Sequence, residues 1–292
     1  YGSGILKFNI DKLSYEPFLK NNTNQLSPER IFDLQKEGDI LYIGTDGNGL
    51  IKHNLKTNET TAHINSGFNT RSVNNNVIRS VFIDQEKNIW LGHFHGGISY
   101  IRTKNNFKNL KYSPFVSQSL SHNNGTSILV DKKNRIWIGT DGGGLNIIED
   151  GIIYNDIHNN LTQIFKGYNP PKILSLFEDK KGFIWIGTYL EGLFIYDPNK
   201  ETITKFNSIY PNLKLCHSDI RCITQDRTGN IWIGTNGGGV NIINTEQNSI
   251  SCIQRDEQHS TNSITLDWVS CFHEDSYGYM WIGTTYGVNV YD

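Results

Sequence analysis

Short apolar strands separated by turn residues recur along the whole chain. The purest stretches read Ile-Trp-Ile-Gly-Thr at 136–140 and 231–235, and each precedes a run of three glycines. The glycine that closes the apolar triplet falls at Gly44, Gly92, Gly139, Gly187, Gly234 and Gly283. These glycines are 48, 47, 48, 47 and 49 residues apart. So regular a spacing indicates stacked copies of one supersecondary unit.

Each copy has the pattern of four short strands. In the fourth copy an apolar strand at 173–177 is followed by a turn that begins with Asp179 and then by the tryptophan strand. An alternating third strand covers 193–196, and a more polar fourth strand covers 202–206. We expect the aspartate to accept hydrogen bonds from the amides of its own turn, because short acidic side chains do so readily.

Four antiparallel strands in every 40–50 residues or so predict an all-β fold, a β-propeller of four-stranded blades. Residues 1–20 match only the third and fourth strands of a first blade, and the last copy stops at 291–292 without its outer strand. We therefore expect seven blades with the first one truncated, and a six-blade ring is the alternative. No linker interrupts residues 1–292, so we expect a single domain, a fragment of a larger ectodomain because residue 1 already lies inside a repeat.

A large aromatic side chain occupies the same strand position in all six copies. Packing between neighbouring blades explains such a position best, and a ligand-binding stripe of rings is the rival interpretation. The residues are Tyr42, Trp90, Trp137, Trp185, Trp232 and Trp281.

Charge and hydropathy narrow the classes of function. The net charge is -2 and the isoelectric point is near 6.5, which provides no basic field for nucleic acid. No apolar run approaches the roughly 20 residues of a membrane-spanning helix. The glycine runs connect strands to strands rather than strands to helices, so they do not form a phosphate-binding loop, and we expect no cofactor.

The four cysteines lie in the last third of the chain, at Cys216, Cys222, Cys252 and Cys271. Cys222 and Cys271 each precede the marker glycine of their copy by 12 residues, where other copies carry serine. A small side chain is needed at that position. We therefore expect free buried thiols rather than a disulfide framework, and no cysteine–histidine spacing suits zinc.

Turns between the second and third strands, and the connections between blades, commonly share one face of a propeller. Residues that depart from the repeat in those segments are therefore candidates for ligand binding. The turns contribute Asp46, Phe94, His95, Tyr189, Glu191 and Tyr286. The connections contribute Arg79, His122, His217, Asp219, Arg221 and Trp268.

Some of these candidates suggest particular chemistry. Trp268 is the one tryptophan outside the recurring position, and it could stack on a sugar ring or cover a blade junction. Arg79 and Arg221 both lie 13 residues before a marker glycine, and they could bind carboxylates or sulfates, or form surface salt bridges. His93 and His95 alternate along one strand and turn, so we expect solvated histidines, or one that hydrogen-bonds a ligand, rather than a metal site.

The sequence Asp-Lys-Lys-Gly-Phe-Ile-Trp-Ile-Gly-Thr at 179–188, with Gly-Gly-Gly-Leu-Asn at 142–146, resembles the two-component regulator propeller repeat. The resemblance covers six copies and a partial one. It implies the periplasmic sensor region of a hybrid histidine kinase of the Bacteroidetes type, which detects an oligosaccharide. It also implies an adjoining propeller or immunoglobulin-like domain, a homodimeric parent and no enzymatic activity in this region.

Two other classes remain open. A plain protein–protein interaction scaffold is the first alternative. A propeller glycosidase or lyase is the second, because sialidases clamp a carboxylate with arginines and their Asp-box resembles the Asp-x-x-Gly-x-Ile-Trp turn. The turn here has one residue more between the aspartate and the tryptophan, and no spacing indicates a tyrosine nucleophile with a glutamate partner.

Overall fold

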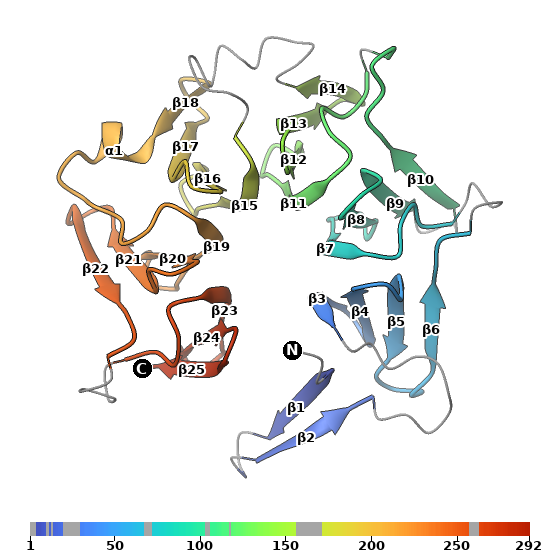
Figure 1. Ribbon diagram of the computed structural model, residues 1–292, viewed down its shortest axis with the longest axis horizontal. Coiled ribbons are helices and arrows are strands. Elements are labelled where there is room, and N and C mark those ends of the chain that lie inside the picture. Colours follow the sequence, from blue (N-terminus) through green and yellow to red (C-terminus); the bar gives the residue numbers. More distant parts are fainter. Residues whose placement is uncertain are drawn as a thin grey trace. The chain divides into compact units, whose positions relative to one another are not determined.

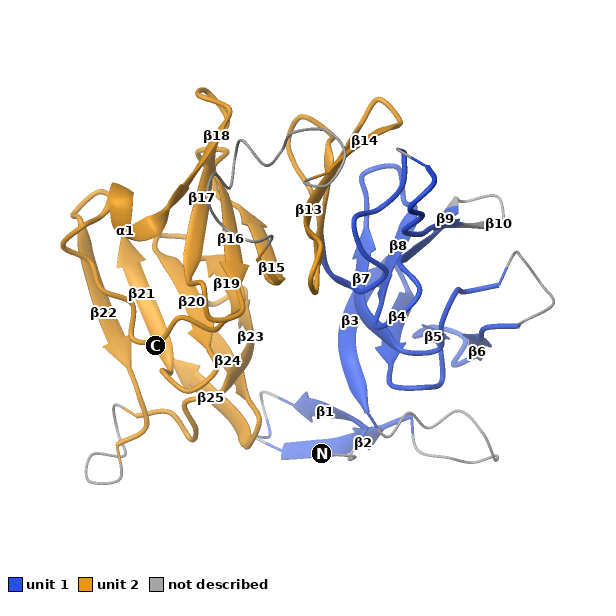
Figure 2. Cartoon of the chain, turned by 45° about the horizontal axis from the view of Figure 1, so that its top comes forward, with its two compact units in different colours: residues 1–128 blue, residues 129–292 orange. Residues whose placement is uncertain are grey.

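The structure is a computed structural model, and it describes residues 4–9, 12, 14–19, 30–66, 72–102, 106–116, 118–155, 171–256 and 263–292. Regular structure in these ranges is β apart from the one-turn helix α1 (Phe206–Ile209). No helix in these ranges has the length and apolar character needed to cross a bilayer. The chain divides into two compact units, residues 1–128 and 129–292 (Figure 2).

The first unit contains one two-stranded and two four-stranded antiparallel sheets (Figure 1). The two-stranded sheet pairs β1 (Ile5–Asn9) with β2 (Ser14–Phe18). The next sheet consists of β3 (Ile31–Glu37), β4 (Ile40–Thr45), β5 (Leu50–Asn54) and β6 (Thr60–His63). It is followed by β7 (Ile78–Ile83), β8 (Ile89–His93), β9 (Ile98–Arg102) and β10 (Asn106–Leu110).

The remaining sheets repeat the same order of strands. One consists of β11 (Gly125–Val130), β12 (Ile136–Thr140), β13 (Gly144–Glu149) and β14 (Ile152–Asn155). The next two contain β15 (Ile173–Glu178), β16 (Ile184–Thr188), β17 (Leu193–Asp197) and β18 (Thr202–Lys205), then β19 (Ile220–Gln225), β20 (Ile231–Thr235), β21 (Val240–Asn244) and β22 (Ser249–Ile253). The last has three strands, β23 (Val269–Glu274), β24 (Met280–Thr284) and β25 (Gly287–Tyr291).

These sheets are the blades of a β-propeller, and the predicted all-β fold with four-stranded antiparallel blades is confirmed. Within the described residues, five blades have four strands and a sixth has three. This agrees with the six-blade alternative. The preferred count of seven is only partly supported, because the first 20 residues provide two strands, β1 and β2, which pair with each other and do not make a full blade.

A buried aspartate anchors the turn between the first and second strands. Asp131 accepts the backbone N–H of Arg135 and the indole N–H of Trp137, each at 2.8 Å. The predicted role of the turn aspartate as an acceptor for its own turn is thereby confirmed. The indole contact recurs at 2.8–2.9 Å in the pairs Asp84–Trp90, Asp179–Trp185, Asp226–Trp232 and Asp275–Trp281.

The recurring aromatic rings pack between sheets at several blades. Trp137 is fully buried, and its ring centroid lies 4.9 Å from that of Tyr196 on β17 of the next sheet. Trp185 and Trp232 belong to similar clusters with the sheets that follow them. Trp90 stacks on Tyr100 of its own sheet. Tyr42 is buried in the core between the first two four-stranded blades. Trp281 is half-buried in the last blade.

The marker glycines are required by the close approach of the first strand. A Cβ on Gly187 would lie 2.6 Å from the Ile220 side chain of the next blade and would collide with Ser175 Oγ. Ser175 faces Gly187 across the β15–β16 pair, and Cys222 faces Gly234 in the same way. This explains why the position 12 residues before the marker glycine has a small side chain, serine or cysteine, in the second to sixth copies.

The chain has no disulfide framework, but two of its four cysteines pair, a question that the sequence left open. Cys216 and Cys252 form a disulfide, with their Cα atoms 6.7 Å apart. The Cys216 amide donates to the Asn241 side chain on β21. The segment before β19 therefore passes beside the β21–β22 strand pair. Cys222 remains a thiol, and burial raises its pKa. Cys271 also lies outside the disulfide but is exposed, so the expected burial is wrong there.

Candidate ligand-binding face

The candidate residues of both predicted sets lie at one end of the blades. In five of the six described blades, the residue after the second strand donates its backbone N–H there to the carbonyl of the residue before the first strand. The bonds join Tyr189 to Lys172, Asn236 to Asp219, Thr285 to Trp268, Asp46 to Arg30 and Phe94 to Val77, at 2.9–3.2 Å. We call this end of the blades the turn edge. It places turn residues beside connection residues, blade by blade.

Asp219 is the centre of the turn edge in the second unit. Its side chain is 2 % exposed, and its Oδ2 accepts hydrogen bonds from Arg221 Nη2 at 2.7 Å and Asn236 Nδ2 at 3.0 Å. Within the part of the chain that the structure describes, the buried Oδ1 has no hydrogen-bond partner. A buried acceptor of this kind normally has a partner, and bound water or ligand can provide one. Arg221 therefore has the salt-bridged role that the sequence left open.

Aromatic and cationic groups surround this carboxylate. The Arg221 guanidinium lies 5.9 Å from the centroid of the Tyr189 ring, and Lys172 Nζ lies 5.7 Å from the same centroid. Lys172 also pairs with Asp141 at 2.9 Å, and this hydrogen bond raises the pKa of the lysine. Tyr189 is 41 % exposed, so its ring remains accessible between two cations.

His217 and Trp268 both lie beside the turn between β20 and β21. The Nδ1 of His217 accepts the backbone N–H of Asp219 at 3.1 Å, which leaves Nε2 as the protonated nitrogen of the neutral ring. Around the position that a Cβ on Gly237 would take, Trp268 Nε1 lies at 3.7 Å and His217 Nε2 at 3.8 Å. Trp268 is 52 % exposed. Two N–H donors and an open indole face therefore gather at one turn.

His122 has the same local role as His217. Its Nδ1 accepts the backbone N–H of Asn124 at 3.1 Å, and Asn75 accepts from Val77 in the equivalent place at 2.8 Å. These contacts stabilise the connection before each first strand, and they explain a polar side chain there without a ligand.

Glu191 and Tyr286 lie in the β16–β17 and β24–β25 turns, and both are exposed. Among the described contacts, neither side chain joins the cluster around Asp219.

The first unit has a separate cluster on its turn edge. The Arg79 guanidinium lies 4.1 Å from the ring centroid of Phe32 and 4.8 Å from that of Phe94. The ring centroids of Phe94 and His95 are 4.3 Å apart. Asp46, also predicted, forms an ion pair with Arg30 at 3.0 Å. The structure therefore brings Arg79, Phe94 and His95 together.

The sequence prediction missed Lys172 and Phe32. Lys172 aligns with Asp219 and Trp268 in the repeat, so a comparison of each position across all copies would have found it. Phe32 occupies in the first copy the place of Arg79 in the second only by strand pairing, because the first copy is one residue shorter there.

The expectation of a solvated His93 is wrong. The side chain is fully buried, and its Nε2 lies 2.7 Å from Ser99 Oγ. Burial lowers the pKa of His93 to about 4. His93 is the last residue of β8, whose five residues are all buried, whereas His95 lies beyond the strand in the turn and is exposed. In the described ranges, no group of three or more histidine, cysteine or acidic residues is arranged to hold a metal ion.

A model of a known repeat family matches the same repeats in this sequence. The model of the two component regulator propeller matches residues 119–142, 167–190, 214–237 and 263–286. Each match runs from the connection before a blade to the turn after its second strand, so it includes the turn edge. Four of the six described blades thus contain a match to this repeat. No curated protein matches the sequence.

Solved structures share the fold. A chain described as the extracellular domain of a hybrid two component system of B. thetaiotaomicron is 20 % identical, with a TM-score of 0.80 over 99 % of this chain and 37 % of that one. The extracellular domain of a one component system of the same organism is 20 % identical, with a TM-score of 0.63 over 100 % and 43 %. Virginiamycin B lyase from Staphylococcus aureus is 12 % identical, with a TM-score of 0.64 over 90 % and 84 %. The chain spans well under half the length of the two extracellular domains.

Proposed function

We propose that this chain is the ligand-sensing propeller of an extracytoplasmic receptor, and that the turn edge of residues 129–292 binds the ligand. The observation that carries the proposal is the cluster of Asp219, Arg221, Tyr189 and Trp268. It combines a buried carboxylate oxygen without a described partner, a guanidinium, and two accessible aromatic rings within one edge.

The chemistry of the cluster suits an oligosaccharide derived from a glycan. A sugar ring presents an apolar C–H face, which an exposed indole such as Trp268 can cover. Its hydroxyl groups can accept from Arg221 and from His217 Nε2. The Lys172 and Arg221 cations on either side of Tyr189 also suit an acidic sugar.

The repeat family supports the signalling part of the proposal. We infer a histidine kinase on the other side of the membrane, in a homodimeric parent with an adjoining propeller or immunoglobulin-like domain. The Cys216–Cys252 disulfide agrees with an oxidising compartment such as the periplasm. A ligand can switch such a receptor only if it binds one arrangement of domains better than another.

Thermal unfolding with a panel of defined oligosaccharides tests this function. Ligand at about 100 times its Kd stabilises the native state by about 2.7 kcal/mol, so a recognised glycan raises the melting temperature by several degrees. We expect Trp268→Ala to abolish the shift. Tyr277→Ala is the matched control, because Tyr277 is 74 % exposed at the opposite end of the last blade.

Two outcomes contradict the proposal. If no glycan stabilises the protein while a protein partner does, the chain is an interaction scaffold. If Trp268→Ala responds like the unchanged protein, the ligand binds elsewhere. Turnover of an activated aryl glycoside would instead support the glycosidase or lyase alternative, whose one structural support is the shared fold with virginiamycin B lyase.

A further inference from the structure

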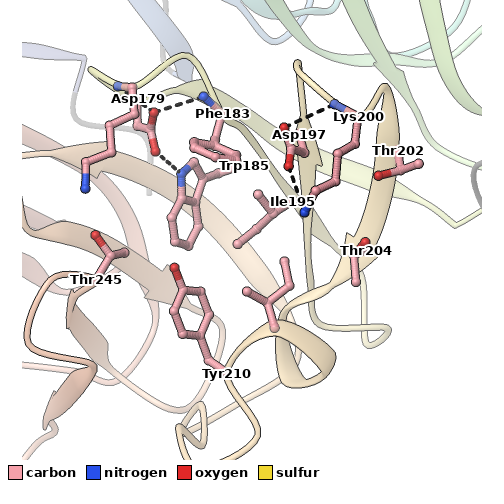
Figure 3. Close-up of a pocket in the computed structure, with 12 residues that line it drawn as sticks. Asp179, Phe183, Trp185, Ile195, Asp197, Lys200, Thr202, Thr204, Tyr210 and Thr245 are labelled. Atoms are coloured by element: carbon pink, nitrogen blue, oxygen red, sulfur yellow. Dashed lines mark hydrogen bonds and ion pairs between the residues drawn. The ribbon is translucent and has the colours of Figure 1, made fainter.

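A cavity of about 390 Å³ lies in the second unit, away from the turn edge. It is lined by residues of β16, β17, β18 and α1, by the β15–β16 and β17–β18 turns, and by Thr245 in the β21–β22 turn of the next blade (Figure 3). Trp185 and Ile195 form its buried base. Figure 3 shows the Tyr210 ring with its hydroxyl group turned toward Trp185. None of the residues predicted to bind ligand lines this cavity.

The helix α1 accounts for the cavity. It begins directly after β18, and among the described residues no other blade has a helix there. Phe206 is fully buried against Trp185, with ring centroids 6.4 Å apart. The Tyr210 amide donates to the Phe206 carbonyl at 2.8 Å, and this holds the phenol ring at the cavity wall. The cavity is therefore a property of this blade and not of the repeat.

The charged groups of the lining already have partners. Asp179 accepts the indole N–H of Trp185 at 2.9 Å. Asp197 accepts the Asn199 amide at 2.9 Å and pairs with Lys200 at 3.5 Å. Lys181 pairs with Glu246 at 3.4 Å. Each charge of the lining thus has a partner among the protein groups, so the cavity offers no uncompensated charge.

Hydroxyl groups are the polar atoms that remain for a ligand. They belong to Thr202, Thr204, Tyr210 and Thr245. In the residues that the structure describes, no protein group hydrogen-bonds to any of these four hydroxyls. They stand around a base formed by apolar side chains, to which Phe183 and Ile209 also contribute. Convergent neutral donors and acceptors over an apolar base are typical of small-molecule sites of this volume.

We propose that this cavity binds an uncharged ring compound that carries hydroxyl groups. The ring would cover Ile195 and Ile209, and its hydroxyls would bond to Tyr210 and the threonines. A phenol and a simple sugar or cyclitol share this chemistry. The proposal concerns a second site and does not depend on the function of the turn edge.

Titration of the 292-residue chain with four small probes, followed by ligand-observed NMR, tests the proposal. The neutral probes are resorcinol and methyl glucoside, and the charged ones are 3-hydroxybenzoate and 3-hydroxybenzylamine. We expect at least one neutral probe to bind about tenfold more tightly than the charged probes. Binding of resorcinol identifies a phenol as the ligand class, and binding of methyl glucoside identifies a sugar or cyclitol.

Variants locate the binding. Tyr210→Phe removes one hydroxyl and should weaken binding about fivefold, the value of one hydrogen bond. Ile209→Trp fills the cavity and should abolish binding. Ile209 is 42 % exposed, so the larger ring is tolerated by the fold, and an unchanged melting temperature verifies this. Tyr277→Phe and Leu55→Trp, at positions 74 % and 41 % exposed, are the matched controls.

The proposal is overturned if neither neutral probe binds, if a charged probe binds as tightly as the neutral ones, or if Ile209→Trp binds like the unchanged chain. Because the variants leave the turn edge intact, failure here would not affect the oligosaccharide test with Trp268→Ala.

Discussion

Carboxylates in this protein titrate differently according to their hydrogen bonds. Burial alone would raise the pKa of Asp226, but the side chains of Trp232, Thr228 and Asn230 donate to it and hold the pKa below its ordinary value. Asp33 has only two backbone donors, the Val81 amide at 2.7 Å and the Leu34 amide at 2.8 Å. Burial therefore prevails and raises the pKa of Asp33 from 3.8 to about 6.

This shift predicts a pH dependence of stability. Because the folded pKa lies above the unfolded one, folded Asp33 keeps its proton to higher pH than the unfolded chain does. Its contribution is fully present below pH 3.8 and is lost as the pH rises through about 6. His93 acts in the opposite sense: its contribution is present above pH 6.5 and is lost as the pH falls through about 4.

Urea unfolding of Asp33→Asn between pH 4 and 7 isolates the first effect, because asparagine does not titrate. Asparagine has one acceptor oxygen for the two amides, so the lost hydrogen bond adds an offset that does not depend on pH. We expect the difference in unfolding free energy to shift in favour of the variant as the pH rises. A constant difference over that range would mean that Asp33 has an ordinary pKa in the folded state.

At the scale of elements, a basic residue follows three of the four turn aspartates in the second unit and links its blade to the next. The backbone N–H of Lys180 donates to Gln225 Oε1 at 2.8 Å, and its ammonium donates to the carbonyls of Asp226 and Arg227 at 3.0 and 2.9 Å. Lys132 and Arg227 contact the following turn in the same manner. These links are charge-assisted hydrogen bonds between the turns of neighbouring blades.

Loss of one link should have a small but measurable effect. We expect Lys180→Ala to lower the midpoint of thermal unfolding by about 2–4 °C, as for about 1 kcal/mol of lost hydrogen bonding. Lys133→Ala is the control, since the Lys133 side chain has no contact among the described interactions. Equal midpoints for the two variants would show that the link does not stabilise the blade interface.

The elements were largely predictable because their signals are local and repeated. The strands expected at 173–177 and 193–196 are β15 and β17 with one residue added to each. The strand expected at 202–206 ends one residue earlier, where Phe206 begins α1. That helix has no equivalent in the other copies, so the repeat could not indicate it or the cavity beside it.

The lack of a repeated signal also explains which features near the candidate site the sequence did not predict. Cys216 and Cys252 occupy no recurring position, and their pairing depends on how a connection passes beside β22. The composition of the turn edge was predictable, because departures from the repeat mark it. Its pairings, such as Arg221 with Asp219, depend on side-chain geometry that one sequence does not specify.

At the scale of the whole molecule, the tryptophans have two different roles, which the sequence alone distinguishes only by position. Trp90, Trp137, Trp185, Trp232 and Trp281 donate their indole N–H to turn aspartates. Trp268 instead lies half-exposed on the turn edge. Because the other five indole N–H groups are bound to aspartates, the signal of the Trp268 indole can report whether a ligand binds at the turn edge.

The most direct test is an NMR spectrum of the ¹⁵N-labelled indole groups, recorded during titration with an oligosaccharide that raises the melting temperature. The account predicts that the Trp268 signal, assigned by its loss in Trp268→Ala, moves with saturation while the five aspartate-bound indoles stay in place. A saturable glycan that shifts other indole signals and leaves the Trp268 signal unmoved would contradict binding at the turn edge.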